Sequence, residues 1–166
     1  VVMSPGSHCY LDHYQGDPAH EPLAIGGFTT VQKTYSYEPV PEGLTPEEGK
    51  HILGAQGNVW TEYILSPEHV EYMAVPRMLA LAEVGWSPKE KRDEGSFIRR
   101  LEEEFAALDA MHVNYSKSLY NVEYRLSGSK KRGQVNVELT SAPGLGEMRF
   151  TTDGSEPQYT SAKFDY

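Results

Sequence analysis

The sequence predicts an α/β fold followed by a shorter region of antiparallel β-structure. Residues 1–115 alternate apolar strand-like runs, polar loops and amphipathic helical patterns, an order typical of α/β proteins. After residue 115, short runs appear in which apolar and polar residues alternate, as antiparallel strands do. Because two strands cannot form the core of a parallel sheet, we expect the first region to be part of a larger α/β barrel.

Two strands and a long loop open the chain. Residues 1–5 (VVMSP) form the first expected strand and residues 51–56 the second. Residues 7–45 are predicted to be one polar loop, and loops of this length are usually functional or disordered. Its aromatic residues favour an ordered loop; they are Tyr10, Tyr14, Phe28, Tyr35 and Tyr37.

Three helices are expected in the first region. Thr45 begins a short one, because Pro46 suits the first helical position and Glu48 completes a capping box. A second begins at Ser66 and is kinked at Pro76. Its core face is formed by Val70, Met73, Arg77, Ala80, Leu81 and Val84. The third covers residues 96–111, and its core side is formed by Phe97, Leu101, Phe105 and Leu108.

The antiparallel region is expected to begin near residues 116–119. Residues 119–126, 134–139 and 147–152 alternate, and the pair Asp153-Gly154 is a strong turn signal. We therefore expect a β-sandwich, or a part of one.

Composition excludes several classes of function. The formal net charge of −9 argues against nucleic acid as a partner, and the basic cluster at residues 130–132 is expected to be a solvated turn. No apolar run approaches the ~18 residues that cross a bilayer. Cys9, the single cysteine, excludes an internal disulfide and is expected to be a small buried residue rather than a reactive thiol.

The two ends of the sequence suggest a piece of a longer chain. Val1 begins directly in an apolar run, without the charged segment that opens a signal peptide, and residues 161–166 (SAKFDY) look cut within an element. We expect further sequence before Val1.

Polar and aromatic residues follow each of the two expected strands, at the ends where parallel barrels place their chemistry. The first cluster holds Tyr10, Asp12 and His13, and the second holds Trp60, Glu62 and Tyr63. Carboxylates accept hydrogen bonds from sugar hydroxyls and aromatic faces cover apolar C–H patches, so the set suits a sugar site. Considered one at a time, Trp60 could be a core residue, Glu62 a surface carboxylate and Asp12 a turn residue.

Other chemistries lack a pattern in this sequence. The six histidines show no paired metal-ligand spacing, Gly26-Gly27 alone does not make a phosphate loop, and no serine or cysteine nucleophile motif occurs. We therefore expect neither a metal nor another cofactor.

Five motifs in order resemble the C-terminal part of the catalytic domain of family 20 β-N-acetylhexosaminidases. They are VVMSPGSHCYLDHYQGDP, GGFTTVQKTYSYEPVP, ILGAQGNVWTEYI, EYMAVPRMLALAEVGWSP and LDAMHVNYS. For residues 1–117 the resemblance implies the C-terminal portion of a (β/α)8 TIM barrel. Residues 118–166, with FTTDGSEP, look like the start of an Ig-like antiparallel β-sandwich. The resemblance also implies exo-hydrolysis of terminal β-linked GlcNAc or GalNAc with retention, the substrate's own acetamido oxygen acting as nucleophile.

The same resemblance implies roles for four residues. Tyr10 looks like the catalytic tyrosine whose hydroxyl hydrogen-bonds the acetamido oxygen, and Trp60 like a wall of the acetamido pocket. Asp12 and Glu62 look like the carboxylates that bind the outer sugar hydroxyls, O4 and O6 in the case of Glu62. Two carboxylates gripping that end of the sugar would admit only a terminal residue.

The sequence departs from the family pattern in two places. It contains no HxGGDE-type motif, whose Asp-Glu pair orients the acetamido group and supplies the general acid. The chain by itself is therefore expected to be inactive. His112 stands where the family more often has glycine, which affects a turn rather than the chemistry.

The leading hypothesis is thus a fragment of an exo-acting β-N-acetylhexosaminidase. The alternatives are a noncatalytic carbohydrate-binding barrel and a purely structural fragment. The expected partner is a terminal N-acetylhexosamine of glycans or chitooligosaccharides, and the truncated chain is expected to self-associate through exposed sheet edges. Family members are usually periplasmic, secreted or lysosomal, so the resemblance implies an extracytoplasmic location.

Overall fold

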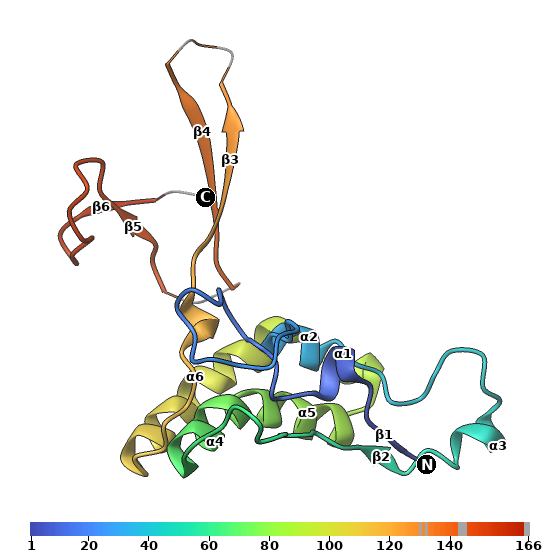
Figure 1. The fold of residues 1–166 in the computed structure, drawn as a ribbon. Coiled ribbons are helices and arrows are strands. Elements are labelled where there is room, and N and C mark those ends of the chain that lie inside the picture. Colours follow the sequence, from blue (N-terminus) through green and yellow to red (C-terminus); the bar gives the residue numbers. More distant parts are fainter. Residues whose placement is uncertain (130, 132, 143–145, 165–166) are drawn as a thin grey trace. The chain divides into compact units, whose positions relative to one another are not determined.

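The chain divides after Leu119 into two units, Val1–Leu119 and Tyr120–Tyr166, each described by itself (Figure 1). The computed structural model describes residues 1–129, 131, 133–142 and 146–164. None of the helices in these ranges has the length and apolar character that a membrane span requires.

The sheet of the first unit is a pair of short parallel strands, β1 (Val2–Met3) and β2 (Gly54–Ala55) (Figure 1). Val2 lies opposite Gly54 and Met3 opposite Ala55. Both predicted strands are confirmed, but each is shorter than predicted. Pro5 has no backbone N–H for a ladder, and Gly6 begins a helical turn, so the first strand cannot continue.

The prediction of one loop over residues 7–45 is wrong, because two short helices lie in or next to it. These are α1 (Gly6–Cys9) and α2 (Val31–Tyr35). The Thr30 side chain caps α2 by accepting a hydrogen bond from the Lys33 amide, which is the ordinary signal of a helix start. Helix α2 buries Val31 and Tyr35, and it packs on a later helix, α5 (Arg77–Trp86).

The predicted capping box at Thr45 is confirmed. The Thr45 hydroxyl accepts from the Glu48 amide at 3.3 Å, and the Glu48 carboxylate accepts from the Thr45 amide at 2.8 Å. The helix that this box begins, α3 (Pro46–Gly49), is as short as predicted.

The predicted helix with a kink at Pro76 is instead two helices, α4 (Pro67–Ala74) and α5. Proline lacks the backbone N–H that the helix would need there and its ring clashes with the preceding turn, so the break replaces a bend. Most of the predicted core face is confirmed. The buried members are Met73, Arg77, Ala80 and Val84, whereas Leu81 is half-buried and Val70 is exposed.

The long helix α6 (Glu94–Ala110) follows a single 3-10 turn, η1 (Lys89–Lys91). The Asp93 side chain caps it by accepting from the Ser96 amide. Its predicted core side is confirmed for Phe97, Leu101 and Phe105, with Ile98 also buried and Leu108 half-buried. Phe97 stacks on Tyr35 of α2, with ring centroids 4.4 Å apart.

Two predictions on single residues hold in this unit. Cys9 is fully buried, and burial raises the pKa of its thiol to about 11, which excludes a reactive thiolate at neutral pH. His112 has a φ of 58° one residue after the end cap of α6, so it occupies a turn, as predicted.

The second unit contains two antiparallel strand pairs. Strand β3 (Glu123–Gly128) pairs with β4 (Val135–Thr140), and β5 (Arg149–Phe150) pairs with β6 (Ala162–Lys163). The turn η2 (Ser118–Tyr120) precedes them. The predicted strand at 119–126 begins later than expected, the one at 134–139 is nearly matched, and the one at 147–152 is reduced to two residues. Gly154 has a φ of 81°, as the turn signal required.

Two sequence predictions fall largely outside the described residues. Only Lys131 of the basic cluster is described, so the predicted turn at residues 130–132 is not covered. The last two residues of the SAKFDY segment also lie outside the described ranges.

Glu83 of α5 connects three helices of the first unit. Its carboxylate accepts a hydrogen bond from the Tyr35 hydroxyl of α2 at 2.9 Å. The Arg100 guanidinium of α6 donates to both of its oxygens, at 2.7 and 2.8 Å. These bonds, chiefly the one from Arg100, lower the pKa of Glu83 below its ordinary value. The carboxylate therefore stabilises the folded state.

We predict that Glu83→Gln lowers the free energy of unfolding at neutral pH by about 1–2 kcal/mol, the contribution of hydrogen bonds to a charged group. Because the folded-state pKa is lowered, this stabilisation is present above the ordinary glutamate pKa of about 4.3 and is lost as the pH falls through the folded-state value. The free energies of unfolding of parent and variant, measured with urea, should therefore converge at acid pH. Glu104→Gln, on the exposed side of α6, is the control. An equal gap at pH 7 and pH 3 would contradict the prediction.

Candidate functional site

The two predicted polar clusters begin at neighbouring points of the same sheet edge. Beyond β1 and β2 the parallel pairing resumes, with Tyr10 opposite Asn58. The Leu11 amide donates to the Asn58 carbonyl at 2.7 Å, and the Asn58 amide donates to the Cys9 carbonyl at 2.8 Å. Between the Met3–Ala55 pair and this one, the first segment inserts helix α1, whereas the second runs on directly. Both clusters thus leave the sheet at its carboxyl edge.

Asn58 is fixed by side-chain hydrogen bonds as well. Its amide nitrogen donates to Ser4 Oγ at 2.6 Å, and its amide oxygen accepts from Gln56 Nε2 at 2.7 Å. Ser4 Oγ in turn donates to the Gln56 carbonyl at 2.9 Å. This network joins the segment after β1 to the segment after β2 and fixes the backbone two residues before Trp60.

Gly57 allows the close approach that this pairing needs. A Cβ atom at residue 57 would lie 3.0 Å from Leu11 Cδ1 and 3.2 Å from Leu81 Cδ2. A larger side chain there would require Leu11 and Leu81 to shift. The sequence therefore places glycine and asparagine between strand and site because one permits contact and the other fixes the register.

The four predicted site residues differ in their exposure. Tyr10 is half-buried, and its ring centroid lies 5.6 Å from that of His13. Asp12 is buried, with 5% of its surface exposed, whereas Glu62 is exposed. Trp60 is 51% exposed, so in this chain it is not a core side chain. Its indole is available for contact from outside.

Asp12 and Glu62 lie within electrostatic reach of each other, although they come from different segments. Burial raises the pKa of Asp12, and the negative charge of Glu62 acts in the same direction, while His13 and Arg77 oppose it. Within the described residues, Asp12 Oδ1 is buried and accepts no hydrogen bond. One buried carboxylate oxygen of Asp12 therefore remains able to accept a hydrogen bond.

His13 is held between its neighbours in the loop. Its Nδ1 lies 3.1 Å from Thr29 Oγ1, and the backbone at Gly27 approaches its ring closely. A Cβ atom at residue 27 would lie 2.5 Å from the ring. The sequence placed His13 in the first cluster but did not predict that residues 27–29 would enclose it.

Arg77 is the functional residue that sequence reasoning undervalued. It was predicted as one member of an apolar helix face, and it is fully buried. Its guanidinium donates to four backbone carbonyls: from Nη1 to His13 (3.0 Å) and Thr29 (2.9 Å), and from Nη2 to Leu11 (2.6 Å) and Met73 (2.5 Å). An arginine on an otherwise apolar face was the signal, since a buried guanidinium requires acceptors.

Burial lowers the pKa of Arg77 to about 10, so it remains charged at neutral pH. Glu21 and Asp12 act in the opposite direction and favour the charged form. Burial also raises the pKa of Glu21, and Arg77 counters that effect. Arg77 is thus a buried cation at the candidate site, and the charges of Glu21 and Asp12 both stabilise it.

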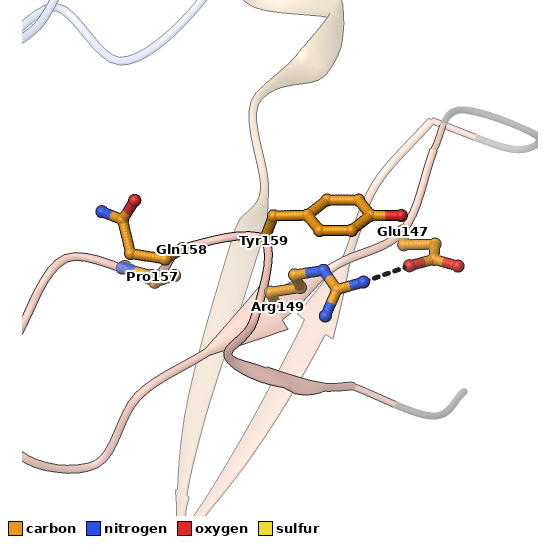
Figure 2. A pocket seen from close by; sticks show the side chains of 5 residues that line it. All are labelled: Glu147, Arg149, Pro157, Gln158 and Tyr159. Carbon is orange, nitrogen blue, oxygen red and sulfur yellow. Dashed lines mark hydrogen bonds and ion pairs between the residues drawn. The ribbon is translucent and has the colours of Figure 1, made fainter.

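The second unit carries a separate surface pocket, shown in Figure 2, with a volume of about 510 Å³. Its lining residues are Glu147, Arg149, Pro157, Gln158 and Tyr159. The Arg149 guanidinium lies 4.7 Å from the Tyr159 ring centroid and forms a 2.7 Å ion pair with Glu147. Its charged groups are therefore engaged with each other. In the described ranges, no three His, Cys, Asp or Glu side chains are grouped to hold a metal ion.

Comparison with known proteins decides the family. The family model "Glycosyl hydrolase family 20, catalytic domain" matches residues 1–89. This chain belongs to glycosyl hydrolase family 20. The family 20 chain is 38% identical to a β-hexosaminidase of Porphyromonas gingivalis over 169 aligned residues, which cover 99% of this chain and 21% of that protein. It is 36% identical to a β-hexosaminidase of Akkermansia muciniphila over 61% of this chain and 20% of that protein.

Solved structures of the family agree with the predicted partial barrel. A family 20 exo-β-N-acetylglucosaminidase of Vibrio harveyi, in complex with N-acetylglucosamine, matches with a TM-score of 0.62 at 34% identity, over 71% of this chain and 19% of that one. A family 20 β-N-acetylhexosaminidase of Streptomyces coelicolor A3(2) matches with a TM-score of 0.62 at 28% identity, over 70% of this chain and 24% of that one. The family 20 chain thus spans about a fifth of the length of these relatives.

The Gly27–His13 contact generates a prediction with a matched control. Gly27→Ala places a methyl group against the His13 ring and should destabilise the protein by about 1–3 kcal/mol through overpacking. Gly26→Ala is the control, because residue 26 also has positive φ (122° against 67°) but meets no atom within 4 Å. Alanine tolerates the φ of Gly27 better than that of Gly26, so backbone strain alone predicts that Gly26→Ala is the more destabilising variant. Thermal unfolding of both variants decides, and a larger loss for Gly26→Ala would refute the contact.

Proposed function

We propose that this chain is part of an exo-acting β-N-acetylhexosaminidase that hydrolyses terminal β-linked GlcNAc or GalNAc by substrate-assisted retaining catalysis. One observation carries the proposal: in a chain of family 20, the segments of Tyr10 and Asp12 and of Trp60 and Glu62 leave the sheet at one edge, paired through Tyr10 and Asn58. The Vibrio relative solved with N-acetylglucosamine supports the substrate class.

Each proposed role follows from side-chain chemistry and exposure. The half-buried Tyr10 hydroxyl donates to the acetamido oxygen, which aligns that oxygen for attack and stabilises its developing charge. The exposed Trp60 indole covers the apolar face of the sugar and its acetamido methyl group. Asp12 Oδ1 accepts from an outer hydroxyl, and Glu62 accepts from O4 and O6.

The general acid is proposed to lie in another part of the protein. The sequence lacks the HxGGDE-type Asp-Glu pair, so the 166-residue chain by itself is expected to bind sugar weakly and to turn none over. A noncatalytic carbohydrate-binding barrel is the alternative, and it would bind sugar without hydrolysis even as the whole protein. A purely structural fragment would do neither, and the exposure of Trp60 disfavours it.

We also propose the division of the chain and its location. Residues 1–117 would complete the C-terminal part of the barrel, and residues 118–166 would begin an Ig-like β-sandwich, to which the two antiparallel pairs contribute. An extracytoplasmic location, whether periplasmic, secreted or lysosomal, follows from family habit alone.

The central prediction concerns activity. In the whole protein, Tyr10→Phe should lower kcat on an aryl β-N-acetylglucosaminide about 10²–10³-fold, because it removes a donor to the group that develops charge. Trp60→Ala should mainly raise KM, because it removes contact made in both ground and transition states. The controls are Tyr124→Phe and Trp86→Ala, which change the same residue types at exposed positions outside the site. Unchanged kinetics for Tyr10→Phe would refute the proposal; sugar binding without turnover in the parent would favour the noncatalytic alternative.

A second prediction concerns the 166-residue chain produced alone. Large apolar side chains of the first unit are exposed, including Leu53 (77%), Leu65 (91%) and Trp86 (90%), and β1 and β2 form a sheet with free edges. We expect the chain to self-associate. Multi-angle light scattering would measure its mass, and a monodisperse monomer that binds no apolar dye would contradict this expectation.

A further inference from the structure

We propose that Arg77 is a positioning residue for the sugar-binding edge, holding the backbone on both sides of Asp12 in place through its four carbonyl contacts. This inference rests on the proposed function, because it assigns Arg77 a part in substrate binding through Asp12. Arg77 itself is fully buried and touches no substrate.

The contacts fall on the two residues that flank Asp12. Nη2 donates to the Leu11 carbonyl at 2.6 Å, and Nη1 donates to the His13 carbonyl at 3.0 Å. The peptide group before Asp12 and the one after His13 are therefore tied to one rigid group. Since the guanidinium is planar, the two carbonyls cannot shift independently of each other.

The other two contacts connect residues 11–13, called here the Asp12 turn, to the rest of the unit. Nη1 also donates to the Thr29 carbonyl at 2.9 Å, and Thr29 Oγ1 lies 3.1 Å from His13 Nδ1. Nη2 also donates to the Met73 carbonyl of α4 at 2.5 Å. The Asp12 turn is thus held against the 27–29 segment, α4 and α5 through a single side chain.

Only arginine can form this arrangement. Its two terminal nitrogens each donate to two carbonyls. Lysine carries a single nitrogen, which cannot reach all four acceptors at once, and it leaves some of these buried carbonyls unpaired. Arg77→Lys therefore keeps the charge and loosens the turn.

A buried arginine with a purely structural role would behave differently, and Arg92 offers that comparison. Its side chain is 6% exposed, it donates to the Tyr37 carbonyl at 2.6 Å and it pairs with Glu38. Its contacts involve neither Asp12 nor the residues beside it. Arg92→Lys thus loosens a buried arginine–carbonyl contact away from the site.

The test compares the two lysine variants in the whole protein, with an aryl β-N-acetylglucosaminide as substrate. A displaced Asp12 weakens binding equally in ground and transition states, so Arg77→Lys should raise KM about tenfold and change kcat by less than about threefold. Arg92→Lys should leave KM unchanged even where it lowers Tm. A KM for Arg77→Lys equal to that of the parent, or an equal rise in both variants, would overturn the inference.

A double-mutant cycle shows whether Arg77 acts through Asp12. If it does, Arg77→Lys in an Asp12→Asn background should raise KM by less than about twofold, because the contact is already lost. Full additivity of the two changes would overturn the inference. So would failure of both Arg77→Lys and Arg77→Gln to fold while Arg92→Lys folds, since that marks a structural role alone.

The parent protein separates this inference from the proposed function. If the parent hydrolyses the substrate and the Arg77 variant keeps the parent KM, only the inference fails. If the parent binds GlcNAc without turnover, the hydrolase proposal fails, and the same comparison is made on Kd by calorimetry with the same expected tenfold difference. If the parent neither binds nor hydrolyses the sugar, both fail together.

Discussion

The arrangement of the first unit depends on one buried cation. Moving a guanidinium out of water is expensive unless its lost hydrogen bonds are replaced. The two terminal nitrogens of Arg77 replace theirs with backbone carbonyls from the Asp12 turn, the 27–29 segment and α4, whereas its buried Nε has no partner among the described residues. Each partner is itself a group that needs a donor, because the carbonyls are buried with it. The segment between α1 and α2 therefore has three of its carbonyls satisfied from the helix side.

A second constraint sets the register at the sheet edge. Asn58 bonds through its backbone to the Cys9 and Leu11 positions and through its side chain to Ser4, so a shift by one residue would break all of these contacts. Gly57 lets the segment approach Leu11 and Leu81 closely enough for those bonds to form. Arg77 fixes the backbone on one side of the candidate site and Asn58 fixes it on the other.

Local signals explain which parts were predictable from sequence. The capping box at Thr45, the irregularity at Pro76 and the face of α6 depend on residues within one or two helical turns. Each was predicted at the correct place, although Pro76 separates two helices where a kink in one helix was expected. Helices α1 and α2 were missed because each is only one turn long and polar residues surround it. The four acceptors of Arg77 lie 4 to 66 positions away in sequence, and three of them are backbone atoms of distant segments. No spacing rule reveals such partners, although the presence of an arginine on an apolar face calls for them. The site residues were predicted from family motifs; the parallel bridge at Tyr10 and the exposure of Trp60 came from the structure.

The electrostatics of the edge link ionisation to the proposed sugar contact. Asp12 is buried beside the negative charge of Glu62, so its carboxylate is less stable there than in water, and its pKa is raised. Arg77 offsets part of this penalty, but its two terminal nitrogens donate to carbonyls rather than to the carboxylate itself. A hydroxyl that donates to Asp12 Oδ1 would stabilise the charged form further. Under the proposed function, a sugar would thus bind more tightly to ionised than to protonated Asp12, and binding would lower the Asp12 pKa. Under this proposal, Arg77 offsets part of the cost of burying the Asp12 charge, and the ligand donates the hydrogen bond that Asp12 Oδ1 lacks.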